Sequence, residues 1–147
     1  MRKGFSLTET IVVLFVFSLV LGISFMSFSK LLKLSDSLFQ SALILSQDIR
    51  GLQLSSILAR NYSYLYLDFY TMKKYILKYP DSKLVERPLP KGIKLSSSSF
   101  GERGYLSFSP TGSPLEGGYI ALSDGRRKLY VIVAVFTGRV RISESFP

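Results

Sequence analysis

An uninterrupted apolar segment near the N-terminus constrains the fold of this chain more than any other feature. Residues 10–29 contain no charged side chain and consist mainly of aliphatic and aromatic residues. About 20 residues of helix rise roughly 30 Å, which is enough to cross the hydrocarbon core of a bilayer. The segment predicts a membrane helix over residues 5–29. Arg2 and Lys3 are expected to hold its first end in the cytoplasm by the positive-inside rule.

The residues that flank the apolar segment narrow its interpretation. Residues 23–29 place bulky side chains at the critical spacings of a secretory cleavage site, which requires small residues, so removal after the segment is not expected. A plain single-pass anchor is the simplest alternative. It does not explain why a charged residue, Glu9, immediately precedes the apolar segment. A carboxylate costs about 2.5–3.5 kcal/mol at a membrane centre and less near its edge. Glu9 is therefore predicted to have a cationic partner.

Residues 3–9, with the sequence Lys-Gly-Phe-Ser-Leu-Thr-Glu, resemble the prepilin peptidase site of type IV pilins and type II secretion pseudopilins. The resemblance implies cleavage between Gly4 and Phe5, so that residues 1–4 are a leader peptide, and methylation of the new amino group on Phe5. It also implies that Glu9 pairs with the N-terminus of a neighbouring subunit during assembly. An α-amino cation on Phe5 is the kind of partner that Glu9 requires.

Apolar residues continue beyond the anchor at helical spacing. They recur three and four residues apart, while the opposite face is polar, which predicts an amphipathic helix over residues 30–59. Gly51 is the weakest point, at a cost of about 1 kcal/mol relative to Ala. We therefore expect one helix, continuous or slightly bent, from near Phe5 to about Ala59. The apolar positions are Leu31, Leu34, Leu38, Ala42, Leu45, Ile49 and Leu52.

The period changes to two after Asn61, which predicts a β-rich region over residues 62–142. Residues 62–67 and 75–79 indicate a hairpin, and Asp124-Gly125 and Thr137-Gly138 are plausible hairpin turns. The serine-rich residues 96–99 are expected to form a polar loop. A long helix followed by strands predicts an α+β fold in which an antiparallel sheet packs on the helix, within a globular domain of residues 30–147. The further strand candidates are residues 104–109, 118–123 and 129–136.

A second resemblance lies in the last third of the chain. Residues 108–112, 118–125 and 137–141 resemble the GspH/FimT-type minor pseudopilins. This resemblance implies a pilin-like fold, a globular domain outside the cytoplasm, and an inner-membrane anchor before assembly into a pilus or pseudopilus. The implied partners are other pilin or pseudopilin subunits, the prepilin peptidase, the inner-membrane assembly platform and, before assembly, membrane lipid.

The absence of two residue types limits the catalytic and metal-binding chemistry available to the chain. The chain has no His and no Cys, which excludes Cys/His and Ser/His/Asp catalysis and the usual zinc sites. The carboxylates are scattered among predicted turns and do not form a calcium loop. No catalytic residue, metal or cofactor is therefore expected, and the chain is predicted not to be an enzyme.

An excess of positive charge is the other chemical signal. Lys and Arg number 19 against 10 Asp and Glu, for a net charge of +9. Arg139 and Arg141 lie two apart in a predicted strand, and Arg126, Arg127 and Lys128 are expected to converge with them on one edge. Arginine binds phosphate in a bidentate manner, so these five residues are candidates for DNA binding, with stacking from Tyr119 or Tyr130. The alternative is a charged edge strand that resists aggregation or docks a neighbouring pilin.

The combined hypothesis is a minor pilin or pseudopilin that supports filament assembly and either protein secretion or DNA uptake. One alternative is a DNA-binding minor pilin of natural transformation that uses the basic C-terminal edge. The other is a single-pass membrane protein of unrelated role. The sequence is compatible with secretion, pilus and competence systems alike.

Overall fold

The computed structural model describes residues 7–33, 37–100 and 104–146, and the chain divides into two units, Met1–Asp36 and Ser37–Pro147. The first unit contains helix α1 (Leu7–Lys33), which includes the whole charge-free segment. Among the described residues, no helix meets the combined length and hydropathy expected of a membrane span.

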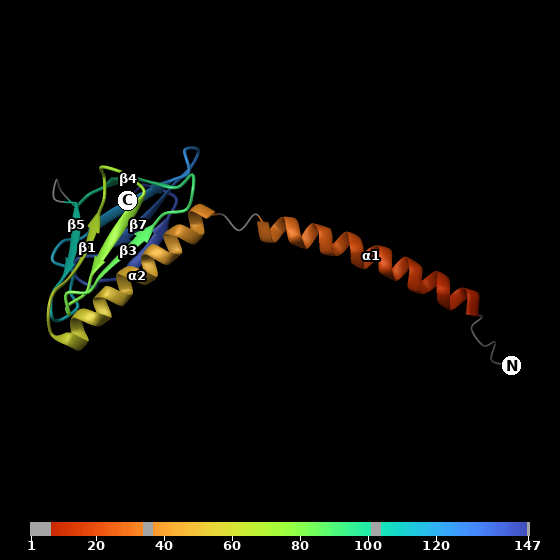
Figure 1. The fold of residues 1–147 in the computed structure, drawn as a ribbon, viewed down its shortest axis with the longest axis horizontal. Helices are drawn as coiled ribbons and strands as arrows, with labels where there is room; N and C mark the ends of the chain where they lie inside the picture. Colours follow the sequence, from red (N-terminus) through yellow and green to blue (C-terminus); the bar gives the residue numbers. More distant parts are fainter. Residues whose placement is uncertain (1–6, 34–36, 101–103, 147) are drawn as a thin grey trace. The chain divides into compact units, whose positions relative to one another are not determined.

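The second unit contains one helix and two antiparallel sheets (Figure 1). One sheet has the order β3-β2-β1-β5 and the other the order β4-β6-β7-β8. The α+β class is confirmed, with two sheets in place of the single sheet that the sequence predicted. The strands of the described residues are β1 (Ser63–Leu67), β2 (Lys74–Lys78), β3 (Leu84–Pro88), β4 (Lys94–Ser98), β5 (Tyr105–Phe108), β6 (Gly118–Ser123), β7 (Lys128–Val133) and β8 (Val140–Ser143).

Helix α2 (Ser37–Ala59) supplies the centre of the core. Its predicted apolar stripe is buried from its first turn onward, and the helix contacts strands of both sheets. The helix ends at Ala59 as predicted, where Arg60 adopts a left-handed φ of 49°. Continuity between α1 and α2 depends on residues 34–36, which lie outside the described residues. The buried stripe is Leu38, Ala42, Leu45, Ile49 and Leu52.

A polar cluster ties α2 to the first sheet. The Tyr75 hydroxyl donates a 2.7 Å hydrogen bond to Asp48 Oδ2, and Arg87 Nε lies 3.3 Å from the same oxygen. Tyr75 is 2% exposed, so desolvation, reinforced by the bond to Asp48, raises its pKa above the usual range. The neutral phenol is therefore maintained as the donor, and the helix is fixed to β2 and β3 at one point.

The strand predictions were confirmed except at β3 and β4. The predicted hairpin is β1 paired with β2, and the three later candidates correspond to β5, β6 and β7, although β7 ends at Val133. The loop prediction for residues 96–99 was wrong, because Ser96–Ser98 belong to β4; β3 was not predicted at all. Both are edge strands, which tolerate Pro and polar residues because one side makes no ladder hydrogen bonds.

The polar cluster generates a stability prediction. Tyr75→Phe should lower the free energy of unfolding of a fragment comprising residues 30–147 by about 1.5–3 kcal/mol, because a hydrogen bond to a charged group is lost. Tyr66→Phe is the matched control, since this tyrosine lies on the outer face of the neighbouring strand, and it should change stability by less than about 0.5 kcal/mol. Equal losses in urea denaturation would contradict a structural role for the Tyr75 hydroxyl.

Candidate functional site

The predicted processing and assembly residues lie at the start of the chain. Gly4 and Phe5 fall outside the described residues. Glu9 occupies the first turn of α1, where the positive end of the helix dipole favours a carboxylate.

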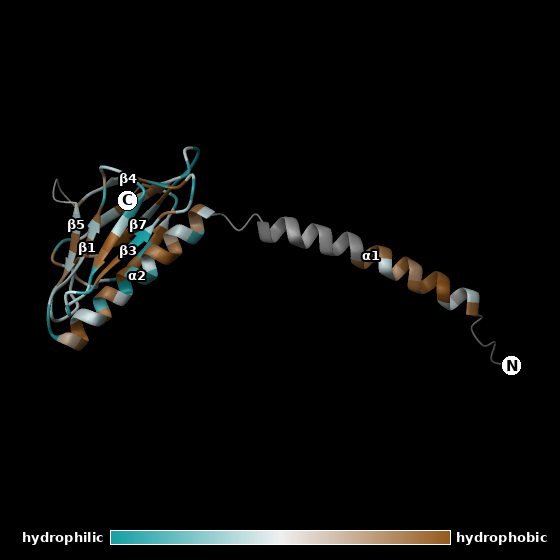
Figure 2. Cartoon of the chain, in the orientation of Figure 1, coloured by the Kyte–Doolittle hydropathy of each residue, from teal (hydrophilic) through white to brown (hydrophobic). Residues whose placement is uncertain are grey.

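The first half of α1 consists mainly of hydrophobic residues (Figure 2). Every large apolar side chain between Ile11 and Leu21 is more than half exposed, and together they surround the helix. A helix that is apolar on all sides is stable only when lipid or protein covers it. Covering each of these side chains is favourable by about 1.5–3 kcal/mol. The described surface of α1 therefore requires an apolar environment.

The β7–β8 hairpin carries Arg139 and Arg141, and both side chains are exposed. Strand register places Arg141 beside Ile132, whose other neighbour across the sheet is Tyr119. These three residues form a row on the outer face of the second sheet. The hairpin is anchored to α2, since Arg50 Nη2 donates a 3.1 Å hydrogen bond to the Val140 carbonyl.

The turn between β6 and β7 carries Arg126, Arg127 and Lys128. Asp124 organises this turn by accepting the backbone N–H groups of Arg126 at 2.8 Å and Arg127 at 2.7 Å. Those two bonds, the one from Arg127 first, lower the pKa of the Asp124 carboxyl below its usual range. The carboxylate therefore remains ionised but is largely occupied within its own turn.

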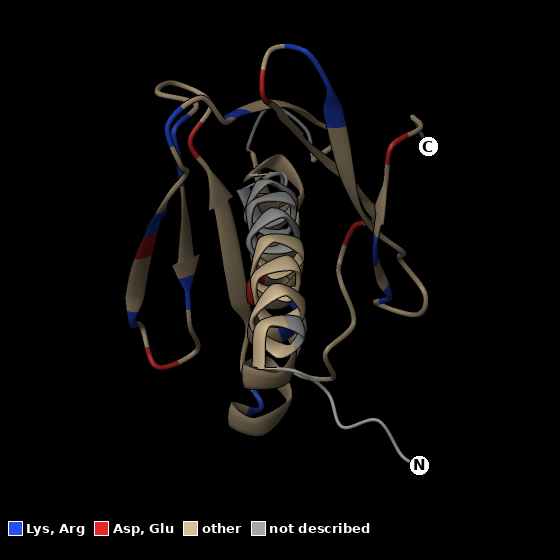
Figure 3. Ribbon diagram, turned by 90° about the vertical axis from the view of Figure 1, so that its right-hand side faces the viewer, with Lys and Arg blue, Asp and Glu red and all other residues tan. Residues whose placement is uncertain are grey.

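The two groups of cations do not converge. Ile132, beside Arg141, is four residues from Lys128 along β7, a separation of about 13 Å at the usual rise per residue. Figure 3 likewise shows the turn between β6 and β7 at one extremity of the second unit. The prediction of one convergent basic edge was wrong, because it treated neighbouring hairpins as if their turns lay at the same end.

Tyr119 and Tyr130, predicted as stacking residues, pack against each other with ring centroids 5.7 Å apart. Phe146 completes an aromatic trio, with centroid distances of 5.3 Å to Tyr119 and 5.6 Å to Tyr130. No periodic pattern identifies Phe146, because it follows the last strand and reaches the tyrosines through the C-terminal tail. The trio is edge-to-face and partly exposed, beside the row that contains Arg141.

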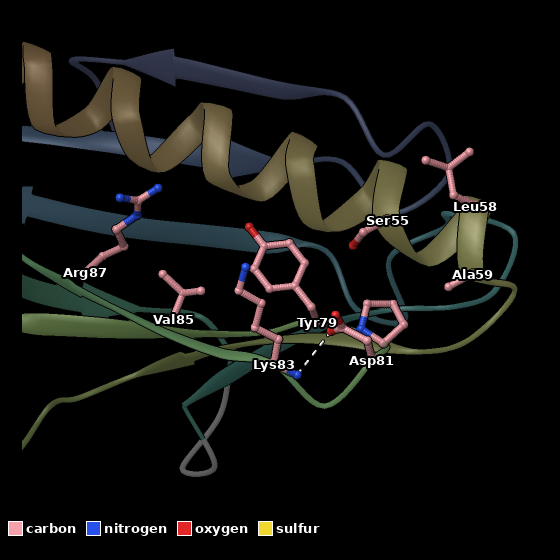
Figure 4. Close-up of a pocket in the computed structure, with 9 residues that line it drawn as sticks. Ser55, Leu58, Ala59, Tyr79, Asp81, Lys83, Val85 and Arg87 are labelled. Atoms are coloured by element: carbon pink, nitrogen blue, oxygen red, sulfur yellow. Dashed lines mark hydrogen bonds between the residues drawn. The ribbon is translucent and has the colours of Figure 1, made fainter.

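A groove of about 540 Å³ separates the end of α2 from the β2–β3 hairpin (Figure 4). Ser55, Leu58 and Ala59 line it from the helix, while Tyr79 and Lys83 are among the residues that face them from the hairpin. The Ser55 hydroxyl donates to the Leu52 carbonyl at 2.8 Å and so is engaged within the helix. Among the described residues, no group of three or more Asp and Glu is arranged to hold a metal ion.

Comparison with known proteins found matches to the N-terminal segment and to the fold. Residues 1–25 match the family described as the prokaryotic N-terminal methylation motif. The fold is similar to that of the minor pseudopilin EpsH from the type 2 secretion system of Vibrio cholerae, at 16% sequence identity and a TM-score of 0.58, over 74% of this chain and 98% of that one. No curated protein matches the chain in sequence.

A second solved structure extends the likeness to pili. The type IV minor pilin FimU of Pseudomonas aeruginosa is similar at 11% identity and a TM-score of 0.58, over 72% of this chain and 87% of that one. The chain thus carries an N-terminal methylation motif and has a fold similar to those of two pilin-like proteins, which confirms the predicted resemblance. The globular fold is similar to that of a minor pseudopilin and to that of a minor pilin.

Proposed function

We propose that this chain is a minor pilin or pseudopilin, a structural subunit of a type IV pilus or a type II secretion pseudopilus. The observation that carries the proposal is the match of residues 1–25 to the N-terminal methylation motif, on a chain whose globular unit has a pilin-like fold. The role is assembly and not catalysis. The inner membrane holds the chain by α1 before assembly, with the globular unit outside the cytoplasm.

The proposed mechanism begins at the leader peptide. The prepilin peptidase removes residues 1–4, and the α-amino group of Phe5 becomes a cation close to Glu9 in sequence. Phe5 and Glu9 lie four residues apart, so pairing within a subunit competes with pairing between subunits. In an apolar environment an unpaired carboxylate is costly, which favours any arrangement that brings a second subunit's amine to Glu9.

The apolar surface of α1 supports the same mechanism. Its side chains are suited to lipid before assembly and to neighbouring helices in the filament afterwards, so transfer between the two environments loses little hydrophobic stabilisation. The pair between Glu9 and the α-amino group of a second subunit then favours the assembled position over the membrane-bound one. Insertion into the filament requires the inner-membrane assembly platform, the prepilin peptidase and other pilin or pseudopilin subunits as partners.

The proposal predicts that Glu9→Gln abolishes assembly. The variant keeps the size and polarity of the side chain but removes the charge, and loss of the pair should cost about 2–3 kcal/mol per subunit. Incorporation into filaments, measured by cross-linking to neighbouring subunits in the native host, should fall to background. Glu116→Gln is the matched control on the exposed surface of the globular unit. Incorporation of Glu9→Gln at the level of this control would refute the mechanism.

DNA binding is a second candidate function, favoured by the exposed Arg139 and Arg141 beside the aromatic trio. Arginine and aromatic side chains on one face are typical of single-strand binding surfaces. Arg126, Arg127 and Lys128 would form a separate contact at the other end of β7. This function would place a DNA-capturing subunit within the same filament and does not compete with assembly.

A salt series tests this second candidate. Under this hypothesis, Arg139→Ala combined with Arg141→Ala weakens binding of a fragment comprising residues 30–147 to single-stranded DNA. The double variant should also reduce the slope of log affinity against log salt by about 1.5. Arg126→Ala with Arg127→Ala removes the same charge from the other turn and should leave more of the binding intact. Absence of DNA binding in the unaltered fragment would eliminate this function.

A further inference from the structure

Six exposed cations gather at the end of the second unit where α2 begins. The β1–β2, β3–β4 and β6–β7 connections meet at this end, and Figure 3 shows their blue segments along its top. Ser41 and Ile44, in the first two turns of α2, line a cavity of about 290 Å³ together with Pro88 and Leu89, which locates the β3–β4 connection beside the start of the helix. We call this surface the basic end: Lys73, Lys91, Lys94, Arg126, Arg127 and Lys128.

Hydrogen bonds join the three connections into one surface. The Leu89 N–H donates to the Lys73 carbonyl at 2.7 Å, and the Leu95 N–H donates to the Met72 carbonyl at 3.0 Å. Lys94 is paired in register with Ser123, which is in turn paired with Lys128. The cations are therefore held in fixed relative positions and do not belong to independent loops.

Carboxylates near the basic end are fewer than its cations. Asp68 is occupied by its own turn, accepting the N–H groups of Tyr70 and Thr71, both at 3.1 Å, and the Thr71 hydroxyl at 2.7 Å. Asp124 is occupied in the same way by the β6–β7 turn, and Glu144 follows the end of β8. Among the described residues, these three carboxylates face six cations, so the surface has a net positive charge.

Two exposed apolar side chains project among these cations. Tyr70 is 98% exposed and Met72 is 42% exposed, both in the β1–β2 turn. Met72 has a left-handed φ of 56°, a conformation that non-glycine residues rarely adopt. Strain of this kind is concentrated at functional positions. An exposed tyrosine beside lysines and arginines is also the arrangement that proteins use at a membrane–water interface.

The opposite end of the same unit differs in charge. Its turns and loops carry Arg60, Lys83 and Arg139 against Asp81 and Glu116, so the charges of the described residues nearly balance there. The positive surface is thus specific to the end at which the chain enters from α1. Only residues 34–36 separate the last residue of α1, Lys33, from the first residue of α2, Ser37.

We propose that the basic end binds the anionic phospholipid headgroups of the membrane that holds α1, before the subunit is assembled. The inference rests on the proposed function, because it requires α1 in a bilayer. A connection of three residues spans at most about 15 Å, so insertion of α1 would limit the distance between the start of α2 and the headgroups. The lysines and arginines bind lipid phosphates, while Tyr70 and Met72 enter the interfacial layer. Anionic lipid thereby holds the unassembled subunit against the membrane, and these contacts are released when the subunit leaves for the filament.

Site-specific spin labels test this proposal on the full chain, which contains no Cys and therefore accepts one label at a time. Tyr70→Cys reports on the basic end, Lys83→Cys on the opposite end, and Phe17→Cys on α1. Each labelled protein is placed in bilayers of phosphatidylcholine alone or with phosphatidylglycerol. Collisions of the label with a nickel-chelating headgroup measure its proximity to the membrane surface.

The label at position 70 should contact the headgroups in bilayers that contain phosphatidylglycerol and should lose most of that contact in phosphatidylcholine alone. Replacing Arg126, Arg127 and Lys128 by Gln should weaken the attraction on the order of 100-fold, because each cation near an anionic surface contributes about a factor of five. The matched variant replaces Arg60, Lys83 and Arg139 by Gln and should leave the contact unchanged. The label at position 83 should stay away from the headgroups in both bilayers.

Three results would overturn the inference, and they are distinguishable. If the label at position 17 is absent from the acyl region, the membrane anchor of the proposed function fails, and the inference fails with it. If position 17 is inserted but position 70 avoids the headgroups in both bilayers, the inference alone is wrong. If the Gln variant of Arg126, Arg127 and Lys128 loses binding to single-stranded DNA but keeps the headgroup contact, the basic end is a nucleic-acid surface.

Discussion

The burial of one face of α2 against two sheets is the interaction on which the rest of the second unit depends. Leu45, Ile49 and Leu52 are fully buried, and the helix contacts both sheets. Since the hydrophobic core consists of residues from Leu38 onward, this unit has its own source of stability. Polar contacts then fix the position of the helix, with Asp48 bonded to the first sheet and Arg50 to the second. The outer sheet faces remain available for recognition.

The direction of α2 determines which turns lie together. The strand β1 returns toward the start of the helix, so successive hairpin turns of the first sheet alternate between the two ends of the unit. The first strand of the second sheet, β4, begins near the start of the helix, and the β6–β7 turn lies at the same end. The β7–β8 turn lies at the other end. This topology separates Arg126 and Arg127 from Arg139 and Arg141. Charges that are close in sequence therefore lie on two separate surfaces.

Much of this organisation could be predicted from residue patterns. The three- and four-residue spacing in α2 and the alternation in β1 and β2 follow directly from burial on one face. The turn at Asp124-Gly125 was also predictable, since Gly125 supplies a positive φ of 88°. Each of these sequence patterns is local, and each gave a correct prediction because the tertiary contacts favour the same local structure.

The remaining features depend on contacts between distant residues. Strand β4 contains three serines and is recognisable only by its partner β6, and Phe146 becomes part of an aromatic trio only through the path of the C-terminal tail. The basic end was missed for the same reason, because Lys73, Lys91 and Arg126 are far apart in sequence and are brought together by three turns. Periodicity identifies elements and their buried faces, but the ends at which loops meet are set by register and topology.

The identity of the mature N-terminus tests the central claim most directly, because the filament mechanism requires both removal of the leader and a new amine at Phe5. Intact-mass and N-terminal peptide analysis of the chain purified from membranes of its native host would establish where the protein begins. The account predicts a mature chain that begins at Phe5 and carries one added methyl group. A chain that retains residues 1–4 in the native host would contradict the pilin mechanism and leave an ordinary membrane anchor as the role of α1.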